Sequence, residues 1–157
     1  MRRESIIMPY IGSSLSVNHR LGRRRDGGYY VKPEVRLWEV EYQWLLKRLH
    51  LEDWRLPLQV TCSAWFKDER SACDLVNFQK VVLDPIEDLT GINDKNMRWR
   101  DGKRTIDPKQ DPHLLITISE PVSDHTPDAL QSTRKPTKEE SSLMGRVKRK
   151  YTRKRRS

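Results

Sequence analysis

A chain of 157 residues is long enough for one compact domain with its own core and an appendage, but not comfortably for two domains. Hydrophobic residues make up 35% and charged residues 34% of the chain, so we do not expect its whole length to pack, and no segment approaches the ~20 apolar residues of a membrane helix. The net charge of +9 lies mostly in residues 121–157, which hold 11 Lys/Arg and 4 Asp/Glu. Residues 1–120 hold 20 Lys/Arg and 18 Asp/Glu and are nearly neutral. The basic charge of the whole chain therefore does not indicate that the folded part binds nucleic acid.

The N-terminal part predicts a strand, a basic loop or hairpin, and a helix. A short apolar run favours a strand over 5–10. Residues 17–28 are polar, and their Asp-Gly-Gly ending is a turn signal that leads into the β-favouring run at 29–31. Over 33–51, apolar residues recur at steps of three and four, which predicts an amphipathic helix. Its expected core positions are Val35, Trp38, Tyr42, Leu45 and Leu49.

The following part predicts a strand, a helix, a hairpin and a last strand. Alternation over 58–66 is typical of a strand with one buried face. A helix is expected over 75–89, and Pro85 inside it should kink or shorten it. Residues 97–106, with a central Asp-Gly pair, predict a hairpin, and 114–119 predict a strand. The expected core stripe of the second helix is Leu75, Phe78, Val82, Ile86 and Leu89. This order predicts a small mixed α/β (α+β) domain over 1–120, with a mixed sheet and two helices.

The C-terminal residues 121–157 are expected to form a disordered basic tail. Ser, Thr, Pro, Lys and Arg dominate them, and the last twelve residues contain eight Lys/Arg, whose like charges repel. A nonspecific DNA tether is the favoured role, with a localisation signal or no role as alternatives. Cys62 and Cys73 show neither a CxxC motif nor zinc-ligand spacing, which favours a reduced, cytoplasmic environment for a soluble protein.

The residues that indicate chemistry lie at the start of the second predicted helix and just after it. Asp74, Asn77 and Lys80 are followed, fourteen residues after Lys80, by Asp94. Metal-dependent phosphodiester cleavage needs hard oxygen ligands to hold Mg²⁺, and Asp74 and Asp94 are candidates to supply them. An ammonium group beside them, such as that of Lys80, stabilises charge that builds on phosphate oxygens.

These residues resemble the motif of the RusA-type Holliday junction resolvases, an Asp-x-Asp-Asn-x-x-Lys at a helix start followed by a downstream Asp-Asp. Asp74, Asn77 and Lys80 fall on the first acid, the Asn and the Lys, and Asp94 falls on the second downstream acid. The resemblance covers roughly residues 5–120. It implies a Mg²⁺-dependent endodeoxyribonuclease, with Mn²⁺ as an alternative ion, that acts as a homodimer on four-way DNA junctions in recombination and repair and is bacterial or phage-encoded.

Two positions depart from that motif. Val76 stands where the family has its second aspartate, and Asn93 stands at the first downstream acid. Fewer anionic ligands should hold Mg²⁺ more weakly. Asp68, Glu69 and Asp84 are nearby carboxylates, but Asp84, ten residues past Asp74, is expected to point in a different direction around the helix. An alternative function is therefore a catalytically impaired protein of the same fold that binds branched DNA.

The stretch before the first helix supplies candidate DNA contacts. Phosphate contact by such a loop carries no sequence information and suits an enzyme that recognises DNA shape. The candidate DNA-binding residues are Asn18, His19, Arg20, Arg23, Arg24 and Arg25. Trp65, and Trp38 or Trp44, are candidate interface residues, with the core as the other interpretation.

Structural interpretations stay open for the same residues. Asp74 before an apolar-periodic helix is commonly an N-cap. Lys80 and Asp84 four apart form an ordinary helix pair worth ~0.3 kcal/mol. The arginines of the loop are then simply solvated. A third function, a basic RNA-binding protein of ribosomal type, is disfavoured because residues 1–120 are nearly neutral and lack an aromatic RNA-stacking motif.

Overall fold

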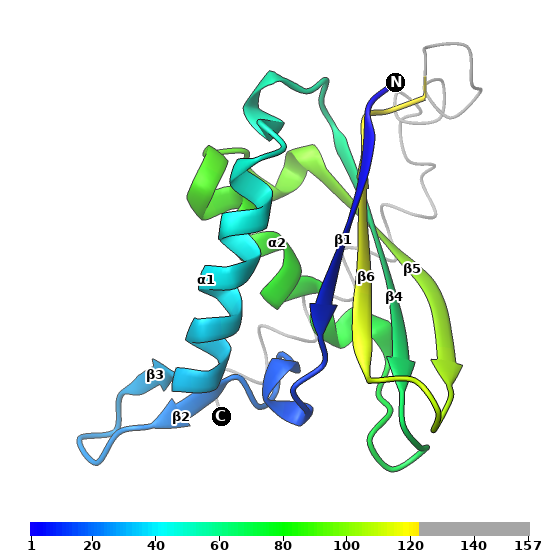
Figure 1. The fold of residues 1–157 in the computed structure, drawn as a ribbon. Coiled ribbons are helices and arrows are strands. Elements are labelled where there is room, and N and C mark those ends of the chain that lie inside the picture. Colours follow the sequence, from blue (N-terminus) through cyan, green and yellow to red (C-terminus); the bar gives the residue numbers. More distant parts are fainter. Residues whose placement is uncertain (123–157) are drawn as a thin grey trace, which may run out of the picture. The chain divides into compact units, whose positions relative to one another are not determined.

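The computed structural model describes residues 1–122, which form a mixed α+β fold with two α-helices, a four-stranded mixed sheet and a two-stranded sheet (Figure 1). The fold class predicted from the sequence is confirmed. Residues 1–121 form one compact unit. The basic tail expected over 121–157 lies, from residue 123 onward, outside the described residues. In the described part, no helix combines the length and the apolar character needed to cross a membrane.

The four-stranded sheet has the order β1 (Arg3–Pro9), β6 (His113–Ser119), β4 (Leu58–Phe66) and β5 (Met97–Ile106). β6 pairs antiparallel with both β1 and β4, whereas β4 and β5 run parallel. Along β4, buried and half-buried residues alternate without exception, as the period-two pattern of its sequence predicted. One side of the sheet therefore faces the core, and the other does not.

The prediction of a hairpin over residues 97–106 is wrong. Met97–Ile106 is one continuous strand that pairs with β4 along its length, and the register shifts by one residue between Cys62 and Ala64. Gly102 lies at this irregularity, where an added Cβ would come within 2.8 Å of the Cys62 carbonyl oxygen and would collide with the Ser63 hydroxyl. The glycine thus permits close approach of two strands and makes a β-bulge rather than a turn.

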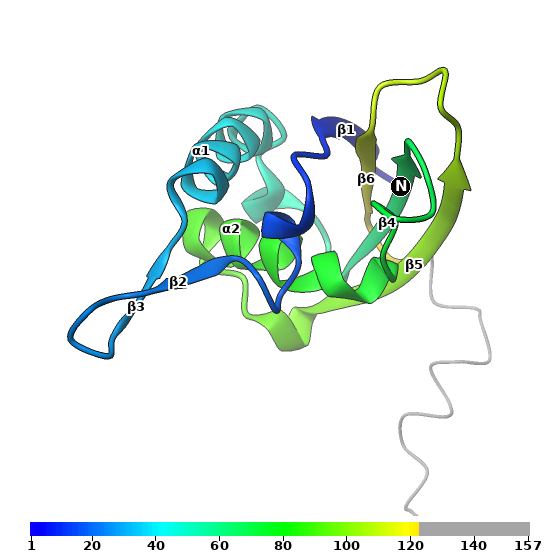
Figure 2. The same cartoon turned by 90° about the horizontal axis from the view of Figure 1, so that it is seen from below.

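Both helices cover the same side of the sheet (Figure 2). α1 (Pro33–Lys47) starts with a proline in its first turn and ends earlier than predicted, because His50 adopts a left-handed conformation (φ 49°) before the short 3-10 helix η2 (Leu51–Asp53). The second predicted helix begins as the 3-10 helix η3 (Leu75–Phe78) and continues as α2 (Gln79–Thr90). α2 runs through Pro85 to Thr90, so the proline does not shorten it.

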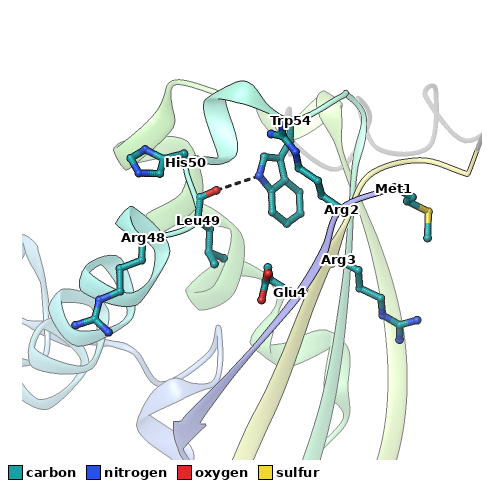
Figure 3. A pocket seen from close by; sticks show the side chains of 8 residues that line it. All are labelled: Met1, Arg2, Arg3, Glu4, Arg48, Leu49, His50 and Trp54. Atoms are coloured by element: carbon teal, nitrogen blue, oxygen red, sulfur yellow. Dashed lines mark hydrogen bonds between the residues drawn. The ribbon is translucent and has the colours of Figure 1, made fainter.

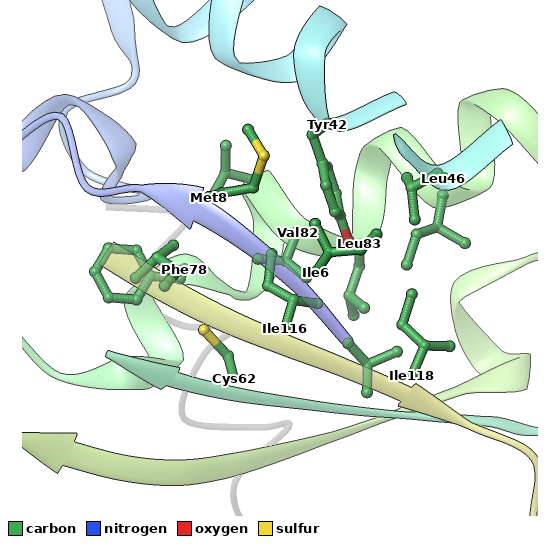
Figure 4. Packing of buried hydrophobic residues seen from close by; sticks show 14 of the residues in the cluster. Ile6, Met8, Tyr42, Leu46, Cys62, Phe78, Val82, Leu83, Ile116 and Ile118 are labelled. Carbon is green, nitrogen blue, oxygen red and sulfur yellow. The ribbon is translucent and has the colours of Figure 1, made fainter. Parts of the chain in front are cut away.

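The hydrophobic core fills the space between the helices and the sheet (Figure 4). Most of the predicted helix stripes are buried, and the remaining positions pack against the core from its edge. On α1 the chain buries Leu46 instead of the predicted Leu45, which is only partly buried. The predicted positions that are buried are Val35, Trp38, Tyr42, Leu75, Phe78, Val82 and Ile86. Of the tryptophans considered above, Trp38 belongs to the core, whereas Trp44 is 65% exposed.

The predicted loop or hairpin before α1 is a two-stranded hairpin formed by β2 (Leu21–Arg23) and β3 (Tyr29–Val31). Its turn uses Gly27 with φ 90°, and the Gly28 amide donates to the Asp26 carboxylate at 2.9 Å. The hairpin extends from the N-terminal end of α1 (Figure 1).

Candidate active site

The motif residues lie where η3 runs into α2 and where the short 3-10 helix η4 (Asp94–Asn96) follows it. Asp74 precedes η3 in extended conformation, and its side chain makes no capping hydrogen bond. The carboxylate is exposed and forms no hydrogen bond or ion pair within residues 1–122. Asp74 therefore occupies the N-cap position of η3, as one interpretation predicted, but its carboxylate does not cap the helix.

A pocket of about 370 Å³ opens between the start of α2 and η4. Lys80 and Asp94, separated by fourteen residues in the sequence, both line it, and so does Val76. The remaining lining residues are Val17, Gln79, Leu83 and Asp84. Asp74 does not line the pocket, but it is two residues before Val76, so their Cα atoms are at most about 7 Å apart. Val76 thus lies at the pocket where the resemblance calls for an acid.

Asp84 lines this pocket together with Lys80, whereas Asp74 does not line it. Lys80 and Asp84, four residues apart in α2, share one face of the helix, and Val76 of η3 lines the same pocket. The Asp84 carboxylate lies 3.1 Å from the Lys80 ammonium and 3.4 Å from the Arg20 guanidinium. It is therefore neutralised on two sides by cations, which lowers its value as a metal ligand. The helix pair of Lys80 and Asp84 is confirmed.

Asp94 and its neighbour Asn93 have different roles. The Asn93 side chain accepts a hydrogen bond from the Lys95 amide at 3.1 Å and so caps η4. The exposed Asp94 carboxylate makes no hydrogen bond or ion pair with any residue in the described part of the chain. The residue at the family's first downstream acid is thus used structurally, and the residue at the second is left free.

Asn77 joins the motif to the loop before β2. Its backbone carbonyl accepts from the Val17 amide at 3.0 Å, and its amide donates to the Asp74 carbonyl at 3.0 Å. The predicted DNA contacts Asn18 and His19 follow directly and are exposed. This places the first predicted DNA-binding segment beside the candidate site.

The four arginines of that segment divide into two groups. Arg20 is drawn into the domain by Asp84, and only 12% of its side chain is exposed. Arg23, Arg24 and Arg25 are exposed on the β2–β3 hairpin. The position of Arg20 favours a structural pairing, so the hairpin arginines remain the candidates for phosphate contact.

Cys73 adds a partly buried thiol next to Asp74. Burial, and then the adjacent Asp74 carboxylate, raise the pKa of the Cys73 thiol above its ordinary value of 9.0. The thiol is therefore protonated at neutral pH and is not a suitable ligand for a hard cation.

The metal expected from the resemblance has few protein ligands to use. Within residues 1–122, no three His, Cys, Asp or Glu side chains come close enough together to hold a metal ion. Mg²⁺ is, however, commonly bound by one or two carboxylates together with substrate phosphates and water. Asp74 and Asp94 are exposed carboxylates without a hydrogen bond or ion pair in the described residues, and carboxylate oxygens are the type of ligand that Mg²⁺ prefers.

A larger pocket of about 540 Å³ lies at the C-terminal end of α1, beside the start of β1 (Figure 3). Arg2, Arg48 and His50 line it, and the Trp54 indole donates to the Leu49 carbonyl at 3.0 Å. None of the predicted site residues lines this pocket. Its size alone does not make it the functional site.

One pairing at the site, between Arg20 and Asp84, was not predicted from the sequence. The spacing of Lys80 and Asp84 was visible, but nothing local connects Arg20 with Asp84, which are 64 residues apart. Comparison with protein-family models and with curated proteins found no match to this chain. The resemblance to RusA-type resolvases therefore stays a prediction.

Proposed function

We propose that this chain is a Mg²⁺-dependent endodeoxyribonuclease that cuts Holliday junctions or related branched DNA in recombination and repair. The observation that supports the proposal is the pocket lined by both Lys80 and Asp94, with Asp74 exposed two residues before the lining residue Val76. These three residues are the ones whose chemistry suits phosphodiester cleavage. Mn²⁺ is an alternative ion, and a bacterial or phage cytoplasm is the proposed location.

Each residue has a distinct proposed role. Asp74 and Asp94 would hold Mg²⁺, which when bound supplies a Lewis acid for the phosphate and lowers the pKa of water. Lys80, whose side chain is 54% exposed, stabilises charge on the phosphate oxygens while Asp84 holds its ammonium at 3.1 Å. Asn77 positions the turn between Asp74 and α2 through its backbone hydrogen bonds.

The proposed DNA contacts lie outside the pocket. Asn18 and His19 lie beside the motif, and the exposed arginines of the hairpin extend the basic surface. Such contacts fix the position of the phosphate backbone without specifying bases. A homodimer would present one site to each of two opposed strands of a four-way junction, which is the partner arrangement we propose.

The test is cleavage of a labelled synthetic four-way junction in the presence of Mg²⁺ or Mn²⁺. We expect Asp74→Asn and Asp94→Asn to abolish cleavage, and Lys80→Met to reduce it by about 100-fold, the typical loss when one charge-stabilising group is removed. Asp88→Asn is the matched control, because Asp88 is an exposed carboxylate of the same helix that does not line the pocket. Absence of cleavage with either metal would overturn the nuclease proposal.

A second candidate function is branched-DNA binding without catalysis. Val76 in the pocket, and an Asp84 carboxylate already paired with two cations, favour it. This candidate predicts junction binding with a steep salt dependence and no metal-dependent cutting. The same junction assay, run as a binding experiment with and without Mg²⁺, separates the two functions.

A further inference from the structure

The side of the four-stranded sheet that faces away from α1 and α2 forms a distinct surface, which we call the open face. It is defined by Gln59, Thr61, Ser63 and Trp65 of β4 and by the residues paired with them on β1, β6 and β5. None of these residues is buried, whereas the alternate residues of β4 are fully buried. Within residues 1–122, no element covers the open face (Figure 2).

Arginines bound one end of the open face. Strand register places Arg3, Ser119, Gln59 and Arg98 in one row across the sheet, and Arg100 lies in the next row. With strands ~4.8 Å apart, that row is about 14 Å wide. Arg3 also lines the pocket at the C-terminal end of α1, although Figure 3 shows its side chain extending away from Trp54. The guanidinium groups thus flank a strip of short polar side chains.

These cations have no acidic partners. Neither strand register nor residue alternation brings an Asp or Glu onto the open face, although residues 1–120 contain 18 of them. Arg3, Arg98 and Arg100 form no ion pair with any residue in 1–122, and exposed Lys103 extends the basic edge along β5. A polyanion is the partner that complements such a surface.

An aromatic pair lies at the other end of the same face. Trp65 and His113, directly paired across β4 and β6, stack with ring centroids 4.5 Å apart and planes 9° apart. The His113 ring is also held 2.7 Å from the Asp111 carbonyl oxygen. Trp65 lies six positions after Gln59 on β4, so the aromatic row and the arginine row are about 20 Å apart. Both rings remain partly exposed.

We propose that the open face binds a single strand of nucleic acid, with phosphates at Arg98, Arg100 and Arg3 and a base stacked on the Trp65–His113 pair. Basic side chains that follow the backbone, combined with an aromatic platform, are what single-strand binding requires. A lipid surface or an acidic peptide would explain the arginines but not the stacked rings. This surface is separated from the pocket by the sheet and the core, so the inference does not rest on the proposed nuclease activity.

The experiment measures binding of the full chain to a labelled oligothymidine of about 20 nucleotides, without divalent metal, over a range of salt concentrations. The double variant Arg98→Gln/Arg100→Gln should reduce the slope of log K against log salt by about 1.4, since each phosphate contact to a single strand contributes about 0.7. Its control is Lys47→Gln/Arg48→Gln, which removes the same charge from exposed positions at the end of α1. The control should leave the slope unchanged.

Trp65 tests the stacking. Trp65→Thr, which retains a β-favouring residue, should weaken binding about tenfold without changing the salt slope, whereas Trp65→Phe should bind nearly as the parent does. If Thr disrupts folding, Trp65→Leu compared with Trp65→Phe makes the same distinction. The binding experiment contains no divalent metal, so its failure is distinguishable from a failure of the nuclease proposal, which is tested by junction cleavage with Mg²⁺ or Mn²⁺.

Two results would overturn the inference. An equal fall in slope for both charge variants means that the strand is bound diffusely rather than at the open face. A change from dimer to monomer in sedimentation for Arg98→Gln/Arg100→Gln, with an unchanged salt slope, means that the face contacts a second copy of the chain.

Discussion

Under the proposed function, Val76 is the residue whose replacement we expect to raise the rate of Mg²⁺-dependent cleavage most. Val76 is 49% exposed and lines the same pocket as Lys80 and Asp94. Val76→Asp would add an anionic oxygen ligand there, and we expect it to raise Mg²⁺-dependent junction cleavage about tenfold or more, because even outer-shell partners change metal affinity by about 10- to 100-fold. Cleavage rate against Mg²⁺ concentration is the measurement.

Val76→Asn is the matched control, since its side chain has nearly the shape of aspartate without the charge. An equal gain for both variants would mean that polarity rather than a metal ligand matters at this position. A parent chain that cuts weakly and a Val76→Asp variant that cuts strongly would identify the missing acid as the cause.

Residue-level prediction succeeded where the relevant spacing was local. Lys80 and Asp84 lie four apart, and their ion pair followed from helix geometry. The expectation that Asp84 points in a different direction from Asp74 stays a prediction, and of these two residues only Asp84 lines the pocket. Pairing of Arg20 with Asp84 depends on how the first loop packs against α2, and no local pattern contains that information.

The Glu120 carboxylate connects the start of β1, the end of β6 and the loop before β4. The Arg2 and Arg55 amides donate to Glu120 at 3.0 and 3.1 Å and hold the pKa of Glu120 below its ordinary value of 4.5. A depressed pKa means that the charged form stabilises the fold at neutral pH and that this stabilisation is lost as the pH falls through the folded-state pKa. Stability at this junction should therefore be sensitive to acid.

Glu120→Gln tests this dependence. We expect the variant to unfold at a lower temperature than the parent at pH 7. The two midpoints should converge as the pH falls from 4.5 through the lower folded-state pKa of Glu120, because the parent carboxyl then becomes protonated as well. Thermal unfolding followed by circular dichroism over a pH series measures the difference. Glu4→Gln removes the same charge from an exposed position on β1 and should leave the midpoint close to that of the parent. A Glu120→Gln difference that stays constant with pH would contradict the linkage.

The sequence predicted which segments form helices and strands, but it did not predict how the strands pair with one another. The alternation in β4 and the three-four steps in both helices are properties of the sequence that the structure retains. The Asp101-Gly102 pair carries a hairpin signal too, yet the long parallel pairing with β4 uses the glycine for close approach instead. Tertiary pairing therefore prevailed over local turn preference.

At the scale of the whole molecule, the sequence predicted a mixed sheet with two helices but not the order in which the strands pair. Periodicity determines which side of a strand is buried, whereas the order β1-β6-β4-β5 depends on contacts between distant segments. The open face illustrates the difference, since Arg3 and Arg98 share a row only because β6 and β4 lie between their strands. No pattern local to either arginine indicates that row.

The buried core of the described residues and most of the net positive charge lie in different parts of the chain, so removing residues 122–157 tests the two separately. All buried hydrophobic residues of the described core lie in 1–121, and so does Glu120, whereas residues 121–157 carry a net +7. A chain ending at Pro121 should unfold cooperatively with a midpoint close to that of the full chain. Its binding to duplex DNA should weaken, and the salt slope should fall by about 0.9 for each phosphate that the removed segment would have neutralised.

Differential scanning calorimetry and a salt titration on the truncated and full chains check both parts. An unchanged salt slope would show that the basic segment neutralises no phosphates, and the hairpin arginines and the open face would then account for DNA binding. A missing or broadened unfolding transition would show instead that residues beyond 121 contribute to the stability of the domain. If the midpoint holds and the slope falls, DNA affinity in this chain is supplied largely by a segment that the fold itself does not need.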